Sequence, residues 1–479
     1  MVKDFSDIEE NSFYEILVIG AGAAGITLSL ELENSKYKVA LIEAGNLKNN
    51  IENQQLMEME TDGPLKHSPL ETVRARQFGG TTNLWGAGLV KYDEIDFIDR
   101  PNINIDGWPI NFAEIEPYYQ RAKKYLKVSK ESFSNNSMLN SINDKFLNND
   151  VVEQKNILRH KSGSNFRKMY LDRFQKSDNI TLFLNSTLSD ISINNKNIKY
   201  VEISNQYQLK KRIKCKTVVL CCGGVENTRL LLNFNKKNKY NIGNVQNALG
   251  KYYSTHINLI NGTLLTSDRV NNNYVDLNNY VSERKYLTLK NQFIYENNLL
   301  NVKIHFEKLD NINLLPKFFN EVSSLISSRA KKLNKYYLNS QFEQTPCKTS
   351  SIKLIEEKDI FGLYKSKIYF DINSSDIDIF NLTYKNLAII FGALNIGRFH
   401  YENVKNVIYR DVIGGSHHIG TTRMITKNYG GSVDKNLNVI GTNNLFCVSS
   451  SCFPTPGHAN PTFTIIALSI KLADFIKNE

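Results

Sequence analysis

A glycine-rich turn near the N-terminus restricts the fold of this chain more than any other feature of its sequence. Residues Gly20–Gly25 read Gly-Ala-Gly-Ala-Ala-Gly, the pattern G-x-G-x-x-G, and they follow directly on the apolar run Ile16–Ile19. A helical pattern over Ile26–Leu32 comes next, and then the mostly apolar segment Lys38–Ile42, which ends at Glu43. Strand, turn, helix and strand in this order predict a dinucleotide-binding unit of a Rossmann-type sheet.

Each part of this unit has a physical role in holding a dinucleotide. Gly20 permits the tight turn, Gly22 lets the backbone approach a pyrophosphate, and Gly25 allows the helix to pack closely on the strand. The N-terminus of the helix offers free N–H groups to phosphate. Glu43 can accept hydrogen bonds from a ribose diol, and its charge argues against the 2′-phosphate of NADP. The turn alone does not distinguish FAD from NAD.

Two further glycine motifs follow along the chain. Residues Arg76–Gly86 read Arg-Gln-Phe-Gly-Gly-Thr-Thr-Asn-Leu-Trp-Gly, and Gly107–Ile110 read Gly-Trp-Pro-Ile before an expected helix over Phe112–Val128. Adjacent glycines beside two hydroxyls suit a backbone that passes close to a flat polar ligand, although a plain turn would also explain them. Cys221–Leu232 predicts a strand, a glycine turn and a helix, which is equally consistent with an ordinary α/β turn.

The C-terminal quarter contains two segments rich in chemically active residues. Ser416–Met424 includes His417 and His418, and Gly457–Thr462 reads Gly-His-Ala-Asn-Pro-Thr. Three of the eight histidines of the chain therefore lie in these two segments. A pair of histidines on a loop is usually structural, so the pattern alone gives only a weak indication of catalysis.

In their order along the chain, these motifs resemble the glucose-methanol-choline (GMC) flavoprotein oxidoreductases, and more narrowly their sugar-oxidising, pyranose 2-oxidase-like branch. The resemblance implies an α/β protein (α+β overall), in which a Rossmann-type FAD-binding domain carries an inserted antiparallel-sheet substrate domain. It places the loop Arg76–Gly86 against the flavin. In pyranose oxidase a histidine just before the tryptophan is bonded to the flavin; Leu84 stands at that position here, so the resemblance implies non-covalent FAD.

The resemblance also assigns the catalytic residues. His417 matches the active-site histidine, Asn460 matches its partner, and His458 occupies a variable position that is expected to point elsewhere. Ser449 stands where the family often has Asp, whereas sugar-branch members frequently have a small residue at this position. The expected cofactor-binding residues are Gly20, Gly22, Ala23, Ala24, Gly25, Glu43, Ala44, Gly45, Arg76, Gly79, Gly80, Thr81, Asn83, Leu84, Trp85, Gly86, Gly223, Ser450, Pro461 and Thr462.

The chemistry of alcohol oxidation requires these residue types. A histidine with a pKa near neutrality suits the removal of the hydroxyl proton, and an amide such as that of Asn460 can donate to the developing alkoxide. His256 follows a segment that resembles another family motif, and a histidine at such a place is more often structural than catalytic.

The middle of the chain predicts strands and helices of a second domain. Short strands are expected at 180–184, 188–193, 199–204, 212–220, 286–295, 300–306, 351–356 and 366–370, and helices at 318–335 and 375–392. We expect residues 1–110, 180–260 and 410–479 to form the FAD-binding domain, and residues 111–179 and 261–409 to form the substrate-binding domain.

The composition of the chain bears on four points: a nucleic-acid partner, a metal site, the location of the protein and a haem group. The net charge of +11 comes from scattered lysines without an aromatic-interleaved basic block, which predicts a solvated surface and no nucleic-acid partner. None of the six cysteines forms a C-x-x-C pair, so free thiols are expected and no metal site. The first residues lack an apolar signal core and no long apolar span follows, so we expect a cytoplasmic protein. A haem attachment motif is absent from the sequence, so an acceptor haem would lie on a partner protein.

These observations together predict an FAD-dependent enzyme that oxidises a CH–OH group of a small sugar or glycoside to a carbonyl, with the hydride passing to flavin N5. Two alternatives stay open. The same fold could oxidise a sterol or an aliphatic alcohol, or it could bind FAD without catalysis. The abundance of Asn, Tyr and Lys between residues 259 and 398 favours a polar substrate.

Overall fold

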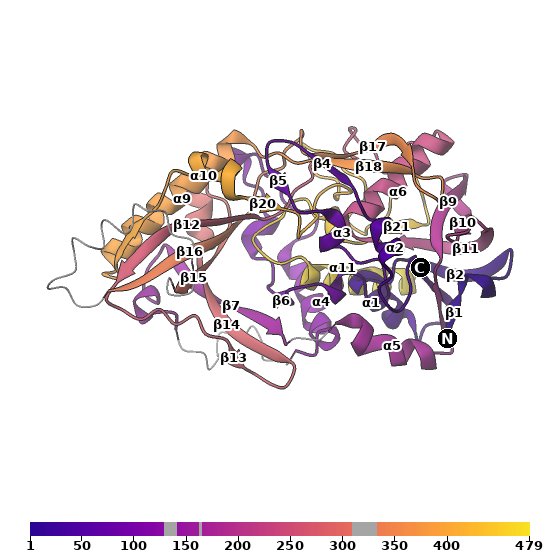
Figure 1. Ribbon diagram of the computed structural model, residues 1–479, viewed down its shortest axis with the longest axis horizontal. Helices are drawn as coiled ribbons and strands as arrows, with labels where there is room; N and C mark the ends of the chain where they lie inside the picture. Colours follow the sequence, from indigo (N-terminus) through magenta and orange to yellow (C-terminus); the bar gives the residue numbers. More distant parts are fainter. Residues whose placement is uncertain (129–140, 162–164, 309–332) are drawn as a thin grey trace.

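The computed structural model describes residues 1–128, 141–161, 165–308 and 333–479. Two eight-stranded sheets dominate these residues, and each is packed on a hydrophobic core of its own. The first sheet lies at the end of the molecule that carries both chain termini, and the second lies at the opposite end (Figure 1).

The first sheet is largely parallel, with the strand order β1-β8-β3-β2-β11-β10-β9 and β21 paired to β11. Its strands are β1 (Val2–Asp4), β2 (Ser12–Ile19), β3 (Val39–Ile42), β8 (Ile180–Leu184), β9 (Thr187–Asn194), β10 (Asn197–Ser204), β11 (Lys210–Leu220) and β21 (Leu445–Cys447). Every residue of β3 and β8 is buried, as expected for parallel strands covered on both faces. The predicted Rossmann-type sheet is therefore confirmed. Of the strands expected between residues 180 and 220, β9 to β11 form an antiparallel meander, whereas β8 pairs in parallel with β3.

Three helices pack against one another beside this sheet: α1 (Ala23–Leu32), α4 (Phe112–Tyr125) and α11 (Thr462–Asn478). The helices α5 (Phe166–Lys176) and α6 (Gly223–Asn238) lie in the same half of the molecule. The predicted boundaries assign residues 111–179 to the substrate-binding domain. The buried side chains of α4 and α5 belong instead to the core of the first sheet, because their apolar faces contact α11 and β8.

The second sheet is antiparallel, with the strand order β19-β12-β16-β15-β14-β7-β6 and β13 paired to β14. Its strands are β6 (Gly88–Leu89), β7 (Val152–His160), β12 (Ile257–Thr266), β13 (Val275–Asp276), β14 (Val281–Leu289), β15 (Val302–Lys308), β16 (Asn334–Phe342) and β19 (Arg398–His400). Side chains alternate between its two faces. One face carries Ile304, Leu338 and Phe342 into the second core, and the residues between them face the other way.

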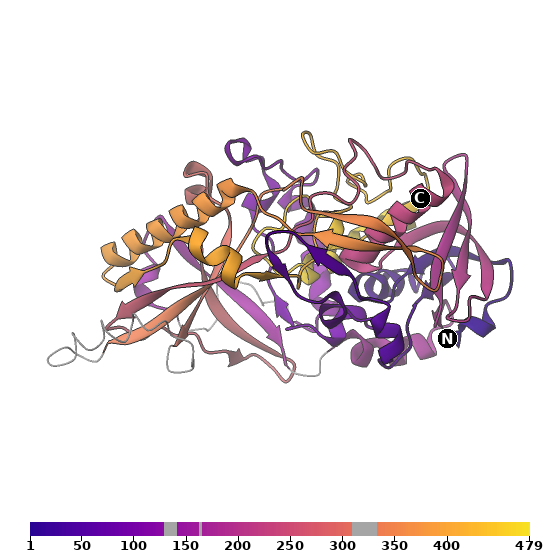
Figure 2. The same cartoon turned by 45° about the horizontal axis from the view of Figure 1, so that its top comes forward.

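Helix α9 (Ser374–Ala393) covers the apolar face of the second sheet, and α10 (Val404–Asp411) packs beside it (Figure 2). The buried stripe of α9 has helical spacing and consists of Ile377, Phe380, Tyr384, Leu387 and Phe391. The predicted strand 286–295 is too long: β14 ends at Leu289, and the short helix α7 (Asn291–Glu296) follows, anchored by the buried Ile294. Residues 318–332 of the predicted helix 318–335 lie outside the described residues. Its last two residues, Asn334 and Lys335, belong to the start of β16.

Smaller elements connect the two halves. Two small sheets contain β4 (Glu60–Asp62), β17 (Ser351–Lys358) and β18 (Tyr364–Tyr369), and β5 (Lys66–His67) with β20 (Ile413–Gly414). The short helices are α2 (Ile51–Gln55), α3 (Leu70–Val73) and the 3₁₀ turns η1 (Phe5–Asp7), η2 (Gly80–Asn83), η3 (Glu94–Phe97), η4 (Pro101–Ile103), η5 (Asp144–Phe146) and η7 (Ser450–Cys452).

Of the helices in the described part of the chain, none combines the length and the apolar character that crossing a bilayer requires. The cytoplasmic location stays a prediction.

Candidate active site

A cavity of about 1080 Å³ runs between the two sheets. One end lies where β2, β3 and β11 stop, since Ile19, Ile42 and Cys221 line it together with the residues that follow them. Ligands of parallel α/β sheets bind at this carboxyl edge. The other end is walled by the second sheet. The volume lies slightly above the usual range for small-molecule sites, about 300–1,000 Å³.

Three helices begin at this cavity without a side-chain cap. The N-cap residues of α1, α6 and α11 are Gly22, Cys222 and Pro461, and none of them accepts a hydrogen bond from the first turn with its side chain. All three helix starts contribute residues to the cavity wall. Their N–H groups and helix dipoles are therefore available to a negatively charged or strongly polar ligand.

Glycines bring the backbone segments of this end into close contact. A Cβ at Gly80 would lie 2.8 Å from the Cα of Gly22, and a Cβ at Gly45 would lie 2.0 Å from the carbonyl oxygen of Arg76. A Cβ at Gly25 would lie 2.0 Å from the carbonyl oxygen of Gly20. By contrast, a Cβ at Gly22 meets only the Cα of Gly80, at 3.9 Å. Gly22 thus leaves space on the ligand side, whereas Gly25 and Gly45 serve backbone packing.

Most of the residues that the sequence assigns to the cofactor line this cavity, and four do not. Gly25, Gly45, Gly79 and Asn83 lie behind the wall. Asn83 donates to the carbonyl oxygens of Phe78 and Gly80, so it supports the turn η2. The predicted residues that line the cavity are Gly20, Gly22, Ala23, Ala24, Glu43, Ala44, Arg76, Gly80, Thr81, Leu84, Trp85, Gly86, Gly223, Ser450, Pro461 and Thr462.

Glu43 joins two parts of the nucleotide end. Its carboxylate accepts hydrogen bonds from the N–H groups of Ala21, at 3.0 Å, and Gly45, at 2.8 Å. Burial raises the pKa of this carboxyl group, while these backbone N–H groups and the nearby Arg76 lower it. Because each carboxylate oxygen has a second lone pair, Glu43 can also accept from a ribose hydroxyl at the cavity surface. The uncapped helix starts, the glycine contacts and Glu43 fit the phosphates and the ribose of a dinucleotide such as FAD.

His417 and Asn460 meet in the wall of the cavity, where Asn460 directly precedes the start of α11. Asn460 Nδ2 lies 3.4 Å from His417 Nε2, and Asn460 Oδ1 accepts a hydrogen bond from Lys303 Nζ at 2.7 Å. Since an ammonium group only donates, Lys303 fixes the orientation of the amide and turns its Nδ2 group toward His417.

A second histidine fixes the tautomer of His417. His256 Nε2 lies 3.1 Å from the carbonyl oxygen of Pro456, which can only accept, so Nε2 carries the proton. Burial and the neighbouring His417 place the pKa of His256 well below its usual value, so its ring is neutral and its Nδ1 is an acceptor. The Nδ1 of His417, 2.6 Å away, must then be the donor. The lone pair of His417 Nε2 therefore faces Asn460 and the cavity.

Burial and neighbouring charges determine the protonation states of His417 and Lys303. Burial lowers the pKa of His417 to about 3, with a further contribution from the positive charge of Lys303. Burial, with Arg284 nearby, lowers the pKa of Lys303 to about 7. His417 is therefore a neutral imidazole at physiological pH, and Lys303 titrates within the physiological range.

The sequence did not predict the wall that the second sheet supplies. Lys303 and His305 on β15, Asn339 and Gln341 on β16, and Asn258 on β12 all line the cavity. The pairing Lys303↔Gln341↔Asn258 places three of them side by side on one face. The alternation of polar and apolar residues in Val302–Phe306 and Tyr336–Phe342 could have identified this face as polar, but not as part of the site.

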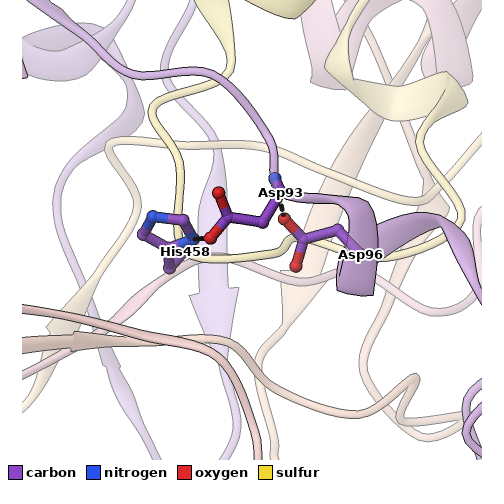
Figure 3. Close-up of side chains that lie close together, drawn as sticks. All are labelled: Asp93, Asp96 and His458. Carbon is purple, nitrogen blue, oxygen red and sulfur yellow. Dashed lines mark hydrogen bonds and ion pairs between the residues drawn. The ribbon is translucent and has the colours of Figure 1, made fainter. Parts of the chain in front are cut away.

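His458 is not among the residues that line the cavity, and its side chain lies in a buried cluster with Asp93 and Asp96 (Figure 3). Its Nε2 contacts the hydroxyl of Tyr286 at 2.9 Å, and its Nδ1 lies 3.7 Å from Asp93. Asp93 pairs with Lys155 at 2.8 Å, and its N–H donates to the carboxyl group of Asp96 at 2.8 Å.

Asp93, Asp96 and His458 lie close enough to hold a metal ion, but Asp93 already has a cationic partner in Lys155, which also pairs with Glu153. Burial, Glu343 and Asp93 raise the pKa of Asp96 to about 8, so it is protonated at neutral pH. We therefore interpret the cluster as the support of the loop that carries Asn460.

Comparison with known proteins finds one family model, two curated relatives and several solved structures that resemble this chain. Residues 393–469, which include His417 and Asn460, match the family model of the GMC oxidoreductases. Two curated relatives are the oxygen-dependent choline dehydrogenases of Photobacterium profundum, 25% identical over 132 residues, and Vibrio vulnificus, 26% identical over 129 residues. Each match spans 24% of this chain and 23% of the relative, so the chain aligns with less than a quarter of either protein.

Solved structures match the fold over almost the whole chain. The structure of pyridoxine 4-oxidase from Mesorbium loti matches with a TM-score of 0.57 at 15% identity, and the match covers 97% of this chain and 99% of the oxidase chain. The structure of formate oxidase matches with a TM-score of 0.61 at 14% identity, and the match covers 98% of this chain and 99% of the formate oxidase chain. The match to the family model is therefore confined to the C-terminal part of the chain, which contains His417 and Asn460, whereas the fold match extends along almost the whole chain.

Proposed function

We propose that this protein is an FAD-dependent oxidoreductase that oxidises a CH–OH group of a sugar or glycoside to a carbonyl. The observation that carries the proposal is the meeting of His417 and Asn460 in a cavity that also contains the uncapped helix starts and Glu43. FAD, when bound without a covalent link, supplies the hydride acceptor that no side chain can provide. The half of the molecule that contains the first sheet would hold this cofactor, and the second sheet would supply the wall that contacts the substrate.

The residues of the chain have separate roles in this reaction. The unprotonated Nε2 of His417 accepts the hydroxyl proton of the substrate. The Nδ2 group of Asn460 donates to the same oxygen and stabilises the negative charge that develops on it. Both groups are held by partners outside the substrate, His256 for His417 and Lys303 for Asn460, so their geometry is set before binding.

The polar wall favours a polyhydroxylated substrate. Asn258, Asn339 and Gln341 offer both donors and acceptors, which suits the hydroxyl groups of a sugar better than the surface of a sterol. Choline, the substrate in the names of the curated relatives, is a cation, and Lys303 and Arg159 on this wall would repel it. A non-sugar alcohol is the alternative within the same chemistry.

The test is the absorbance of the purified holoprotein, mixed without oxygen with free sugars, sugar acids, sugar phosphates, glycosides and non-sugar alcohols. Loss of the oxidised-flavin band with one sugar supports the proposal, and loss only with a non-sugar alcohol supports the alternative. His417→Ala should retain FAD and slow the loss at least ~10²-fold. A flavin that dithionite reduces but no alcohol reduces would contradict the enzymatic role.

A further inference from the structure

We propose that the substrate alcohol carries an anionic group, a carboxylate or a phosphate, near the hydroxyl that is oxidised, and that Lys303 binds this group. The inference rests on the proposed function and specifies its substrate class.

Lys303 is a buried cation without a carboxylate partner. It is 3% exposed and lines the cavity, and its Nζ donates to the neutral amide of Asn460. Among the described residues, no Asp or Glu forms an ion pair with it. A buried ammonium group without a counter-charge is costly, and such groups are normally paired. A ligand anion in the cavity would supply the missing charge.

Two arginines extend the positive wall beyond Lys303. Arg159 on β7 lines the cavity, and Arg284 on β14 lies on the same face of the sheet, since it pairs with Ile157. Both guanidinium groups lie over the ring of Tyr274, at 5.7 and 4.7 Å from its centre. Within the described chain, neither arginine has an ion-pair partner, and Arg284 Nε is buried without a hydrogen bond. The electrostatic effect of Arg284 reaches Lys303 and His305.

The acidic residues of the cavity are all engaged elsewhere. Glu43 accepts from two backbone N–H groups at the nucleotide end. Glu226 pairs with Arg74 and Arg229. Asp411 pairs with Arg410. The wall opposite the nucleotide end is therefore positively charged, and the overall charge of +11 would attract an anion toward it.

An anion at Lys303 would also assist the base. Lys303 disfavours the protonated form of His417, which weakens that imidazole as a proton acceptor. A carboxylate or phosphate beside Lys303 would offset its charge and raise the pKa of His417 in the complex. Neutral alcohols would not produce this effect, so an anionic substrate would improve both binding and proton transfer.

The experiment compares neutral and anionic members of the same sugar series, such as galactose with galacturonate and glucose with glucose 6-phosphate, by anaerobic flavin reduction of the holoprotein. We expect the anionic member of a pair to have at least a tenfold lower Kd than the neutral member. A lower Kd for galacturonate would indicate a carboxylate site, and a lower Kd for glucose 6-phosphate would indicate a phosphate site. Lys303→Met should raise the Kd of the anionic member by a factor at least ten times larger than the factor by which it raises the Kd of the neutral member. Lys303→Arg should restore most of the affinity, and Lys405→Met, which removes an exposed charge, should change neither.

A binding measurement keeps this inference separate from the proposed function. Acetate and inorganic phosphate, titrated into the holoprotein, should perturb the flavin absorbance at millimolar concentration or below, and Lys303→Met should abolish the change. If no alcohol reduces the flavin but this anion effect is present, the proposed function fails while the anion site stands. Equal Kd values for the neutral and anionic sugars, or equal losses of both in Lys303→Met, would overturn the inference and leave Lys303 as a support of Asn460.

Discussion

The Nδ1 atoms of His256 and His417 lie 2.6 Å apart, with the two rings nearly perpendicular, at 85°. Only one proton fits between them, and the carbonyl oxygen of Pro456 decides that it belongs to His417. His256, which the sequence places in a structural role, therefore acts as a positioning residue. It selects the tautomer in which His417 can accept a proton from the cavity side, as the buried acid does in a catalytic triad.

Replacing His256 should separate this positioning effect from folding. In His256→Leu, the Nδ1–H of His417 loses its acceptor and the other tautomer becomes accessible, so we expect the limiting rate of flavin reduction to fall by about tenfold or more. His256→Gln carries an acceptor and a donor on one planar group and should recover part of the rate. Stopped-flow reduction measures the limiting rate and the substrate Kd separately.

A tautomer effect lowers the limiting rate but leaves the substrate Kd and the FAD content unchanged. If His256→Leu instead weakened substrate binding and cofactor binding together, His256 would have a merely structural role.

Two glycines of the first turn should respond differently to substitution. A Cβ at Gly22 has ordinary contacts, and the backbone there has a φ of −87°, so Gly22→Val should fold and lose FAD because its side chain occupies the phosphate side of the turn. A Cβ at Gly25 would lie 2.0 Å from a carbonyl oxygen, so Gly25→Ala should destabilise the fold by at least about 2 kcal/mol.

The measurements are thermal unfolding and the flavin absorbance of the purified variants. Full flavin occupancy in Gly22→Val would remove the phosphate-binding role from this turn. An unchanged unfolding temperature in Gly25→Ala would show that the turn can relax.

The nucleotide end could be predicted from the sequence because its chemistry is local. One continuous segment contains β2, the turn Gly20–Gly25, α1 and Glu43, and their order and spacing together indicate a dinucleotide site. His417 and Asn460 could be assigned only by resemblance, since 43 residues separate them and no periodicity relates two loops.

The substrate wall could not be predicted because it is assembled from separate strands. Lys303, Gln341 and Asn258 come from three different strands and become neighbours only through strand register. A one-residue change of register would turn each of these side chains into the apolar core. The second partner of His417 was missed for a similar reason: the contact with His256 joins residues 161 positions apart in the sequence.

Asp96 should make the stability of the protein depend on pH. Burial, Glu343 and Asp93 raise its pKa to about 8 in the folded state, whereas an unfolded Asp titrates near 3.9. Between these values the folded state binds more protons than the unfolded state, so stability falls as the pH rises from about 4 to about 8. Asp96→Asn, which cannot ionise, should have a flatter dependence of unfolding temperature on pH.

The variant keeps only one side-chain oxygen, whereas the two oxygens of Asp96 accept from Asp93 N–H and Asn301 Nδ2, so we expect a lower unfolding temperature than the wild type at pH 5. The difference should shrink or reverse by pH 9. Parallel curves for the two proteins from pH 5 to 9 would mean that Asp96 is ionised in the folded state at neutral pH.

Lys303 should make the affinity for an anionic substrate depend on pH in the same range. Burial and Arg284 lower its pKa to about 7, so the free site loses its positive charge as the pH rises through 7. The bound anion favours the protonated lysine and raises its pKa in the complex. Between the two pKa values, the Kd of an anionic substrate should therefore rise by up to about tenfold per pH unit, while the Kd of its neutral counterpart stays constant.

The matched control is Lys303→Arg, because a guanidinium group keeps its charge throughout this range and should remove the pH dependence. Flavin-reduction titrations at intervals from pH 6 to 9 measure both Kd values in the same protein. A Kd that rises equally for the neutral and the anionic sugar would assign the pH effect to another group. A Kd for the anion that stays constant in the wild type would mean that Lys303 keeps its charge to pH 9, and that Asn460 and the nearby wall solvate it better than its burial implies.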